Sequence, residues 1–267
     1  MPRTNLSSPP ASTAVSSNPD LPPPGGLCAI HQPNLFPRLS TLAKLFAADY
    51  WIVLDDVQFT RRDYQHRALL AALGDQRRQW LSIPTHLPQG QPTRIKDALI
   101  VDLARSRRRT ESMLRQYYAS SPHWPAFDRA LAPVLERFST GKTATVAEAS
   151  TRILLDLLGW NGRILHSSQL AARPGRSQRL ADLAAVTGAR SYLCGTGGMT
   201  YLDSGLFSAC GVTVTPFRIP TAGAWDSGRQ VSAVLALMSV GPQSLADALR
   251  TVAAQTITQP VACRPTA

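Results

Sequence analysis

The segment from residue 27 to residue 54 constrains the fold of this chain more than any other part of it. A short apolar run over 27–30 leads into a loop with two prolines, which cannot continue a sheet interior. Apolar residues then recur with the helical period over 39–46, and a second β-rich run follows over 50–54. Strand, loop, helix and strand in this order predict a right-handed crossover between two parallel strands.

The rest of the chain continues this alternation of strand-like and helix-like patterns. We predict further strands over 80–84, 95–101, 164–166, 191–194 and 212–217, and further helices over 178–186 and 232–238. Between them, from about 105 to 158, the helical period dominates. These patterns predict an α/β fold: a Rossmann-like layered domain with a mainly parallel sheet and a helical middle segment.

The two ends of the chain differ in composition from its middle. Residues 1–26 are rich in proline and serine and contain little to bury, so we predict a disordered tail there. A single α/β domain is expected over 27–254, followed by a loose C-terminal tail over 255–267. No apolar run approaches the roughly 20 residues that a membrane-spanning helix needs, and the N-terminus lacks the apolar core of a secretory signal. We therefore expect a cytoplasmic protein without a membrane span.

The cysteine positions and the net charge limit the metals and binding partners that the sequence suggests. The cysteines lack the close spacing of a zinc site or a redox dithiol, so we expect inert thiols and no metal at Cys28, Cys194, Cys210 and Cys263. The net charge is +11, and arginines gather at Arg61, Arg62 and Arg67, at Arg77 and Arg78, and at Arg105, Arg107, Arg108, Arg109 and Arg115. A solvated surface and a phosphate-rich partner both account for these clusters. Nucleic acid fits such a partner, but no other feature supports it.

Two polar stretches directly follow the first two predicted strands. His31, Gln32 and Asn34 follow one strand, and Asp55 and Asp56 follow the other. Ligands of open α/β sheets bind outside the carboxyl ends of strands, so we expect these stretches to be neighbours in space. His31 suits an acid, a base or a hydrogen-bond donor, and the aspartates suit a Mg²⁺ ion, a substrate amine or the orientation of His31. A loop histidine bonded to the backbone and a simple aspartate turn are the structural alternatives.

Two further groups of residues suit the binding of an anion. Planar hydrogen-bonding side chains that can hold a carboxylate or a phosphate follow closely at Arg61, Arg62, Tyr64, Gln65 and Arg67. A glycine-rich loop follows a predicted strand at Gly195, Thr196, Gly197 and Gly198. That loop matches neither the P-loop nor the dinucleotide spacing, so a tight turn explains it equally well and the cofactor stays unknown. A serine nucleophile elbow, a paired-histidine zinc helix and a calcium loop are absent from the sequence.

Several of these stretches together resemble the WbqC-like proteins. The resemblance rests on Ile30–Pro37, Leu54–Phe59, Tyr64–Arg67 and Trp80–Pro84, and on a later glycine-rich block over Tyr192–Gly198 and Tyr201–Asp203. It covers residues from about Ala29 to Pro242, and it adds Gln58, Tyr201 and Asp203 to the candidate binding residues. The sequence departs from the family at Leu235, where an Asp usually ends a Ser-x-x-Asp pattern, and at Arg38, where a Trp is common.

The resemblance implies a role in the biosynthesis of O-antigen or other surface polysaccharides, with glycine or aminoacyl transfer as the suggested reaction. We therefore predict an acyl or aminoacyl transferase, in surface-polysaccharide or secondary-metabolite biosynthesis, with a small-molecule or carrier-bound donor. His31 would be the general base or oxyanion donor, Asp55 or Asp56 would orient it or the acceptor amine, and arginines at 61, 62 and 67 would hold the donor's phosphate or carboxylate.

Two alternatives remain open at the level of the sequence. The His31 loop suits a nucleotidyltransferase or another ATP-dependent enzyme, with a nucleotide and Mg²⁺, but the second histidine of such loops is replaced by Asn34. His66 or His86 would then have to complete the pair. The other alternative is a non-catalytic binding or scaffold module with a basic face for phosphates.

Overall fold

A five-stranded parallel sheet forms the centre of the computed structural model, which describes residues 26–74 and 76–258. The strand order is β7-β2-β1-β8-β9, with β1 (Leu27–His31), β2 (Tyr50–Val53), β7 (Arg163–His166), β8 (Ser191–Gly195) and β9 (Thr213–Phe217). From β1, the next strands extend the sheet to one side and the last two extend it to the other. This doubly wound order confirms the predicted Rossmann-like α/β fold.

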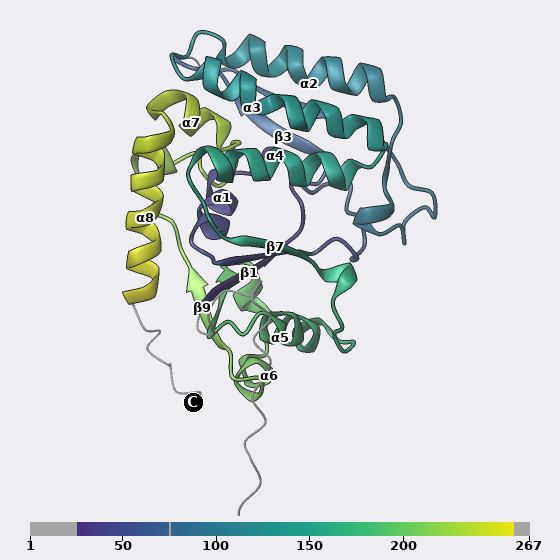
Figure 1. The fold of residues 1–267 in the computed structure, drawn as a ribbon, viewed down its shortest axis with the longest axis vertical. Helices are drawn as coiled ribbons and strands as arrows, with labels where there is room; N and C mark the ends of the chain where they lie inside the picture. The colour runs from purple at the N-terminus through teal and green to yellow at the C-terminus, as the bar shows by residue number, and fades with distance from the viewer. Residues whose placement is uncertain (1–25, 75, 259–267) are drawn as a thin grey trace, which may run out of the picture.

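Helices cover both faces of the sheet (Figure 1). On one side lie α1 (Leu39–Phe46), α2 (Leu103–Tyr118), α3 (Trp124–Glu136) and α4 (Thr143–Leu157). On the other lie α5 (Arg176–Val186) and α6 (Ser204–Ala209). Alternate strand residues serve the two layers: Ala29 and Trp51 belong to the larger core with α1 and α4, whereas Cys28 and Ile52 belong to the smaller core with α5.

In the described part of the chain, two further helices and five 3₁₀ turns complete the helical elements. The last described elements are α7 (Val234–Val240) and α8 (Pro242–Thr258), and α8 contacts α1, α7 and β9. The 3₁₀ turns are η1 (Ile95–Asp97), η2 (Arg137–Thr140), η3 (Ser167–Gln169), η4 (Gly198–Thr200) and η5 (Gly223–Trp225). The expected helix over 232–238 corresponds to α7. No helix was expected over α6 or α8, and α8 extends past Ala254 into the segment expected to be loose. The rest of that segment and residues 1–25 lie outside the described residues.

Two small antiparallel pairs lie outside the main sheet. They join β3 (Arg67–Ala71) to β4 (Arg78–Ser82), and β5 (Thr85–His86) to β6 (Leu99–Ile100). β3 was not predicted, and the strand predicted over 95–101 is a 3₁₀ turn followed by the short β6. The backbone amides of Ile95 and Lys96 donate instead to the carbonyls of Val57 and Asp55, which holds this segment in a turn against the loop after β2.

The sheet separates between β1 and β8. These two strands pair only at their amino ends, where Leu27 faces Ser191 and Cys28 faces Tyr192. β1 pairs with β2 along its length to His31, so the gap lies on one side of β1 alone. It is the point at which the strand order reverses, and open α/β sheets bind their ligands at such a switch point.

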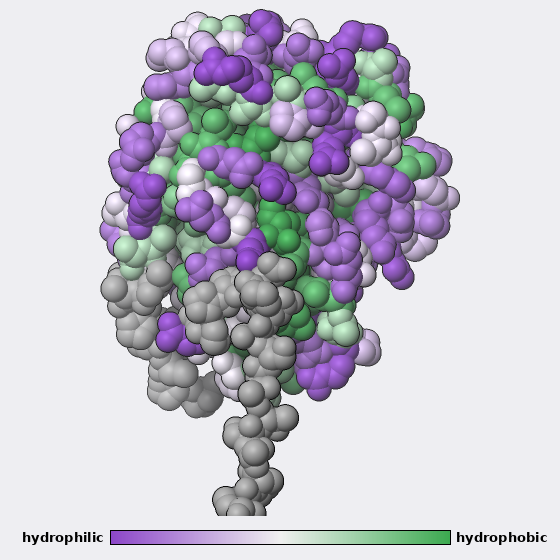
Figure 2. All heavy atoms as spheres, in the orientation of Figure 1, coloured by the Kyte–Doolittle hydropathy of each residue, from purple (hydrophilic) through white to green (hydrophobic). Residues whose placement is uncertain are grey.

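The surface is strongly polar where the helices lie. The α2 arginines predicted to be solvated or to bind phosphate are all exposed (Arg105, Arg107, Arg108, Arg109 and Arg115). Figure 2 shows hydrophilic residues over much of this part of the molecule, at the top of the view. Among the described residues, no helix has the length and apolar character to cross a membrane.

Candidate functional site

A pocket of about 440 Å³ lies at the switch point, beside the carboxyl ends of β1, β8 and β9. Its basic lining residues come from the loop before α1, from α1 itself and from segments after β9: Arg38, Lys44, Arg218 and Arg229. His31 and Gln32 line it as well, and the described lining residues include no Asp or Glu. Cations that face a pocket without carboxylates make it a site for an anion.

Lys44 is the least expected of these lining residues. It lies in α1 and is only 8% exposed, and no carboxylate pairs with it in the described part of the chain. The pKa of Lys44 is lowered to about 8, mainly by burial; Cys194 and Cys28 oppose this shift, and Arg38 adds to it. A fraction of this amine is therefore unprotonated near neutral pH, as a general base requires.

His31, at the end of β1, is neutral at physiological pH. Burial is the main cause that lowers its pKa well below the usual value, and the charges of Lys44 and Arg38 add to it. Its Nε2 lies 3.2 Å from the hydroxyl oxygen of Thr41 on α1. The indole Nε1 of Trp51 donates to the His31 carbonyl oxygen at 3.2 Å, which ties β2 to this strand end.

Gln65 is connected to the pocket through the lining residue Gln32. It was predicted to contact the ligand, but its side chain is fully buried and lies outside the pocket lining. Its Nε2 donates to the side-chain oxygen of Gln32 at 2.7 Å, and its own oxygen accepts from the Thr60 amide at 3.4 Å. Gln65 therefore orients Gln32, which does line the pocket.

The glycine-rich loop after β8 forms another wall, with Gly195, Thr196, Gly197 and Gly198 all in the lining. A β-carbon at Gly198 would come within 2.5 Å of the Cys194 sulfur, so the close approach requires glycine there. Tyr201 also lines the pocket, and the guanidinium carbon of Arg176 lies 3.6 Å from the centre of its ring. Asp203, also predicted to bind the ligand, instead accepts a hydrogen bond from the Gly205 amide as the N-cap of α6.

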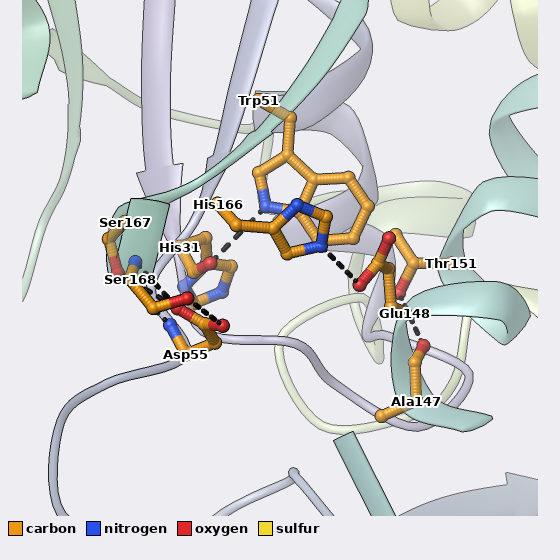
Figure 3. A network of polar contacts seen from close by, with 9 residues as sticks. All are labelled: His31, Trp51, Asp55, Ala147, Glu148, Thr151, His166, Ser167 and Ser168. Carbon is orange, nitrogen blue, oxygen red and sulfur yellow. Dashed lines mark hydrogen bonds and ion pairs between the residues drawn. The ribbon is translucent and has the colours of Figure 1, made fainter. Parts of the chain in front are cut away.

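The two aspartates expected to be catalytic lie beside the pocket rather than in its lining. Asp55 is buried and accepts hydrogen bonds from the Ser168 amide at 3.0 Å, the Ser168 hydroxyl at 2.8 Å and the Ser167 hydroxyl at 3.1 Å (Figure 3). Asp56 pairs with Arg179 of α5 and accepts from Ser167. The two strand ends are neighbours as expected, with His31 opposite Val53, but the polar contact of the His31 imidazole is with Thr41.

An ion pair that the sequence did not suggest completes this polar group. Nε2 of His166, at the end of β7, lies 2.9 Å from a carboxylate oxygen of Glu148 on α4 (Figure 3). The hydrogen bond that His166 donates to Glu148 raises the pKa of His166, against the effect of burial, and the charges of Glu148 and Asp55 contribute. Together, Asp55, Asp56, Glu148 and His166 form what we call the acidic cluster.

The remaining predicted binding residues are outside the described pocket lining. The Gln58 amide donates to the Gln91 carbonyl at 2.9 Å, and the Asn34 carbonyl accepts from the Thr151 hydroxyl at 2.9 Å. The arginines at 61 and 62 are exposed, and Arg67 donates to the backbone carbonyls of residues 62 and 63. Tyr64 lies under Arg38.

The structure brings together a different set of cations from the one that the sequence suggested. Arg218 directly follows β9, so the rule that selected His31, a polar residue at a strand end, also indicates it. Lys44 and Arg229 carry no such local signal. Across residues 26–74 and 76–258, no three His, Cys, Asp or Glu side chains are grouped so that they could hold a metal ion.

The strand order and the pocket define a doubly wound α/β protein with a pocket at its switch point, where open α/β sheets bind their ligands. The sequence profile of the WbqC-like protein family matches residues 32–246, and the chain belongs to this family. It is also similar to the uncharacterised protein Rv1507c of Mycobacterium tuberculosis (strain ATCC 25618 / H37Rv), with 25% identity over 191 residues, which cover 71% of this chain and 80% of that protein. No solved structure matches the chain.

Proposed function

We propose that this WbqC-like protein is a transferase that moves an acyl or aminoacyl group from a donor carrying a phosphate or a carboxylate. The observation that carries the proposal is the pocket at the switch point, where arginine and lysine side chains converge without a lining carboxylate. An anionic donor would neutralise these charges, and Arg holds phosphate and carboxylate groups in a bidentate manner. The reactive carbonyl of the donor would then lie between Lys44 and His31.

Lys44 is suited to act as the general base. The acceptor nitrogen attacks the carbonyl carbon of the donor and gives its proton to the Lys44 amine, and the leaving group departs with the donor's anionic part. His31 is neutral and suited to donate a hydrogen bond to the oxygen on which negative charge develops. This proposal moves the base role from His31 to Lys44, because the pKa of Lys44 lies closer to neutral pH.

The family resemblance supports the biological setting that we propose. We place the reaction in the cytoplasm, in the biosynthesis of a surface polysaccharide or a secondary metabolite, with a small-molecule or carrier-bound donor. A strain that lacks this chain should then accumulate a glycan or metabolite without one acyl or aminoacyl substituent, which mass spectrometry detects. An unchanged product profile would count against this setting but not against the chemistry of the pocket.

The nucleotidyltransferase alternative has less support. Its second histidine would have to come from His66 or His86, and both lie outside the described pocket lining. The ring of His66 packs 5.3 Å from that of Phe59, and burial lowers its pKa to about 4, with Arg67 and Arg61 adding to the effect. His86 lies in the short strand β5.

Covalent trapping of Lys44 tests the proposed pocket chemistry without knowledge of the natural donor. The chain contains three lysines, Lys44, Lys96 and Lys142. Pyridoxal 5′-phosphate, an aldehyde with a phosphate, condenses with a free amine with loss of water, and borohydride reduces the imine to a stable amine. Peptide mapping should show Lys44 modified first, with a pH midpoint near 8, and inorganic pyrophosphate should protect it. Equal modification of all three lysines without protection would refute an anion pocket at Lys44.

Substitution of the two proposed catalytic residues tests their roles once a donor is known. Lys44→Met should lower turnover by about 10²- to 10⁴-fold through loss of the base, and His31→Ala by about 10²- to 10³-fold through loss of an oxyanion donor. Lys96→Met is the matched control and should leave turnover unchanged. Wild-type turnover in His31→Ala would remove His31 from the mechanism.

A further inference from the structure

A row of two aromatic side chains with an arginine at each end leads away from the pocket. The guanidinium carbon of Arg38, a pocket residue, lies 4.1 Å from the ring centre of Tyr64. The ring of Tyr64 lies 5.8 Å from that of Trp80, and the guanidinium carbon of Arg67 lies 4.4 Å from the Trp80 ring. We call these four residues the hairpin strip, because two of them belong to the β3–β4 hairpin.

The hairpin strip is continuous with the pocket through one backbone segment. Arg38 donates from Nη1 to the carbonyl of Arg229, which also lines the pocket, at 3.1 Å. The next residue, Gln230, accepts from Arg78 of β4 at 3.3 Å. Side chains two apart in a strand share a face, so Arg78 and Trp80 lie on the same side of the hairpin. The strip therefore begins in the pocket lining at Arg38 and extends two aromatic rings, Tyr64 and Trp80, beyond it.

Trp80 is unusually exposed for an indole. It is 37% exposed, although it pairs with Leu69 in the hairpin, and its neighbour Leu81 is fully buried. The adjacent guanidinium of Arg67 is fixed by hydrogen bonds from its side chain to the carbonyls of Asp63 and Arg62. The exposed aromatic surface is thus held in a defined orientation by its neighbours, as a preformed binding surface requires.

The chemistry that this combination recognises is that of a nucleotide. Nucleobases stack on aromatic rings and on guanidinium planes without dependence on sequence, and arginines hold the attached phosphates. A neutral sugar can also stack on an indole, but it would leave the arginines and lysine of the pocket without an anion. A simple phosphate or carboxylate would fill the pocket and leave the strip unused.

We propose that the hairpin strip binds the base of a nucleoside diphosphate, or of a donor built on one, whose phosphates lie in the pocket. The base would stack on Trp80, the ribose would pass Tyr64, and the phosphates would contact Arg38 and the other pocket cations. This inference rests on the proposed function, because it names the class of anionic donor that the same pocket takes.

Calorimetric titration compares inorganic pyrophosphate with ADP, UDP, CDP and GDP at one fixed salt concentration. At least one nucleoside diphosphate should bind the wild-type protein about tenfold more tightly than pyrophosphate, the size expected for one stacked base. Trp80→Leu should remove this advantage and leave the affinity for pyrophosphate unchanged. Leu103→Ala, at a similarly exposed apolar residue of α2 (39%), should preserve the advantage.

A second variant, Trp80→Phe, keeps the test valid if Trp80→Leu fails to fold, and its tryptophan fluorescence is measured during titration. Phenylalanine keeps a stacking surface, so the nucleotide advantage should largely persist, whereas the quenching of tryptophan emission by the nucleotide should fall. If pyrophosphate binds the wild-type protein and no nucleotide binds more tightly, the strip inference is wrong and the anion pocket stands. The strip inference is also wrong if Trp80→Leu leaves the affinity for nucleotides unchanged. If neither pyrophosphate nor any nucleotide binds at millimolar concentration, the anion pocket of the proposed function fails as well.

Discussion

The carboxyl edge of the sheet carries two polar regions that use their charges in opposite ways. Beside β1, β8 and β9, the pocket gathers Arg38, Lys44 and further cations, with no carboxylate in the described lining. Beside β2 and β7, the acidic cluster pairs each carboxylate with a donor, such as Ser168 for Asp55 and Arg179 for Asp56. Carboxylates whose hydrogen bonds are satisfied within the protein stabilise the fold, whereas cations without a carboxylate partner favour an anionic ligand.

The largest effect on stability is expected for Lys44, and it tests whether this buried amine lacks a carboxylate partner. Burial lowers the pKa of Lys44 from 10.5 to about 8. Between these values the unfolded chain holds a proton that the folded chain has released, so the free energy of unfolding should rise with pH. Below pH 8 Lys44 is protonated in both the folded and the unfolded state, and its burial then lowers the free energy of unfolding by the full amount, about 3 kcal/mol. Lys44→Met should therefore exceed the wild type in stability at pH 7, and its advantage should shrink towards pH 10.5.

Urea unfolding of the two proteins across this pH range measures the effect. The comparison with Lys44→Met is needed because burial raises the pKa values of Cys28 and Cys194, which gives a contribution of the opposite sign above pH 9. A stability difference that does not change with pH would mean that Lys44 has an unrecognised partner.

Removal of a carboxylate from the acidic cluster should lower the free energy of unfolding, whereas removal of the Lys44 amine should raise it. Asp55→Ala leaves the amide and hydroxyl donors of Ser168 without their acceptor, although Ser167 keeps Asp56, in a position where Asp55 itself is 7% exposed. We expect a loss of about 2–3 kcal/mol in urea unfolding, with the affinity for pyrophosphate unchanged. A loss of pyrophosphate binding without a loss of stability would make Asp55 part of the ligand site and erase the contrast between the two regions.

A single pocket arginine should affect ligand affinity and little else. Arg218 is exposed and lines the pocket, so Arg218→Met should weaken pyrophosphate binding about tenfold, equivalent to about 1.4 kcal/mol. Calorimetry at low and high salt measures the change, and its unfolding curve should match that of the wild type. An equal loss of stability would indicate that Arg218 has a structural role.

The smallest effect is expected for the exposed arginines of α2. Arg107→Gln combined with Arg108→Gln should change stability by no more than about 0.5 kcal/mol and leave pyrophosphate affinity unchanged, although the variant loses as much positive charge as two pocket substitutions. If this variant weakened binding as much as Arg218→Met, the pocket would owe its affinity to the net charge of the protein, and the basic scaffold alternative would gain support.

Local patterns explain what could be predicted from the sequence. The first crossover and His31 were identified because strand, proline loop and helix lie close together in the chain. The role of Asp55 could not be identified in this way, because its partners Ser167 and Ser168 lie 112 and 113 positions away. Lys44 looks like any lysine of a short helix until β8, far along the chain, forms the opposite wall of the pocket. β3 was missed because its apolar residues, buried in part on both faces, do not alternate with polar ones.

The short pairing of β1 with β8 divides the cations of the pocket between two halves of the sheet. Arg38 and Lys44 belong to the half of the sheet that β1 begins, whereas Arg218 and Arg229 follow β9 in the other half. These four cations thus lie on both sides of the line where β1 and β8 share only two residue pairs. An anion bound on this line would attract the cations of both halves at once. It would add an electrostatic link between two strands whose backbone pairing is short.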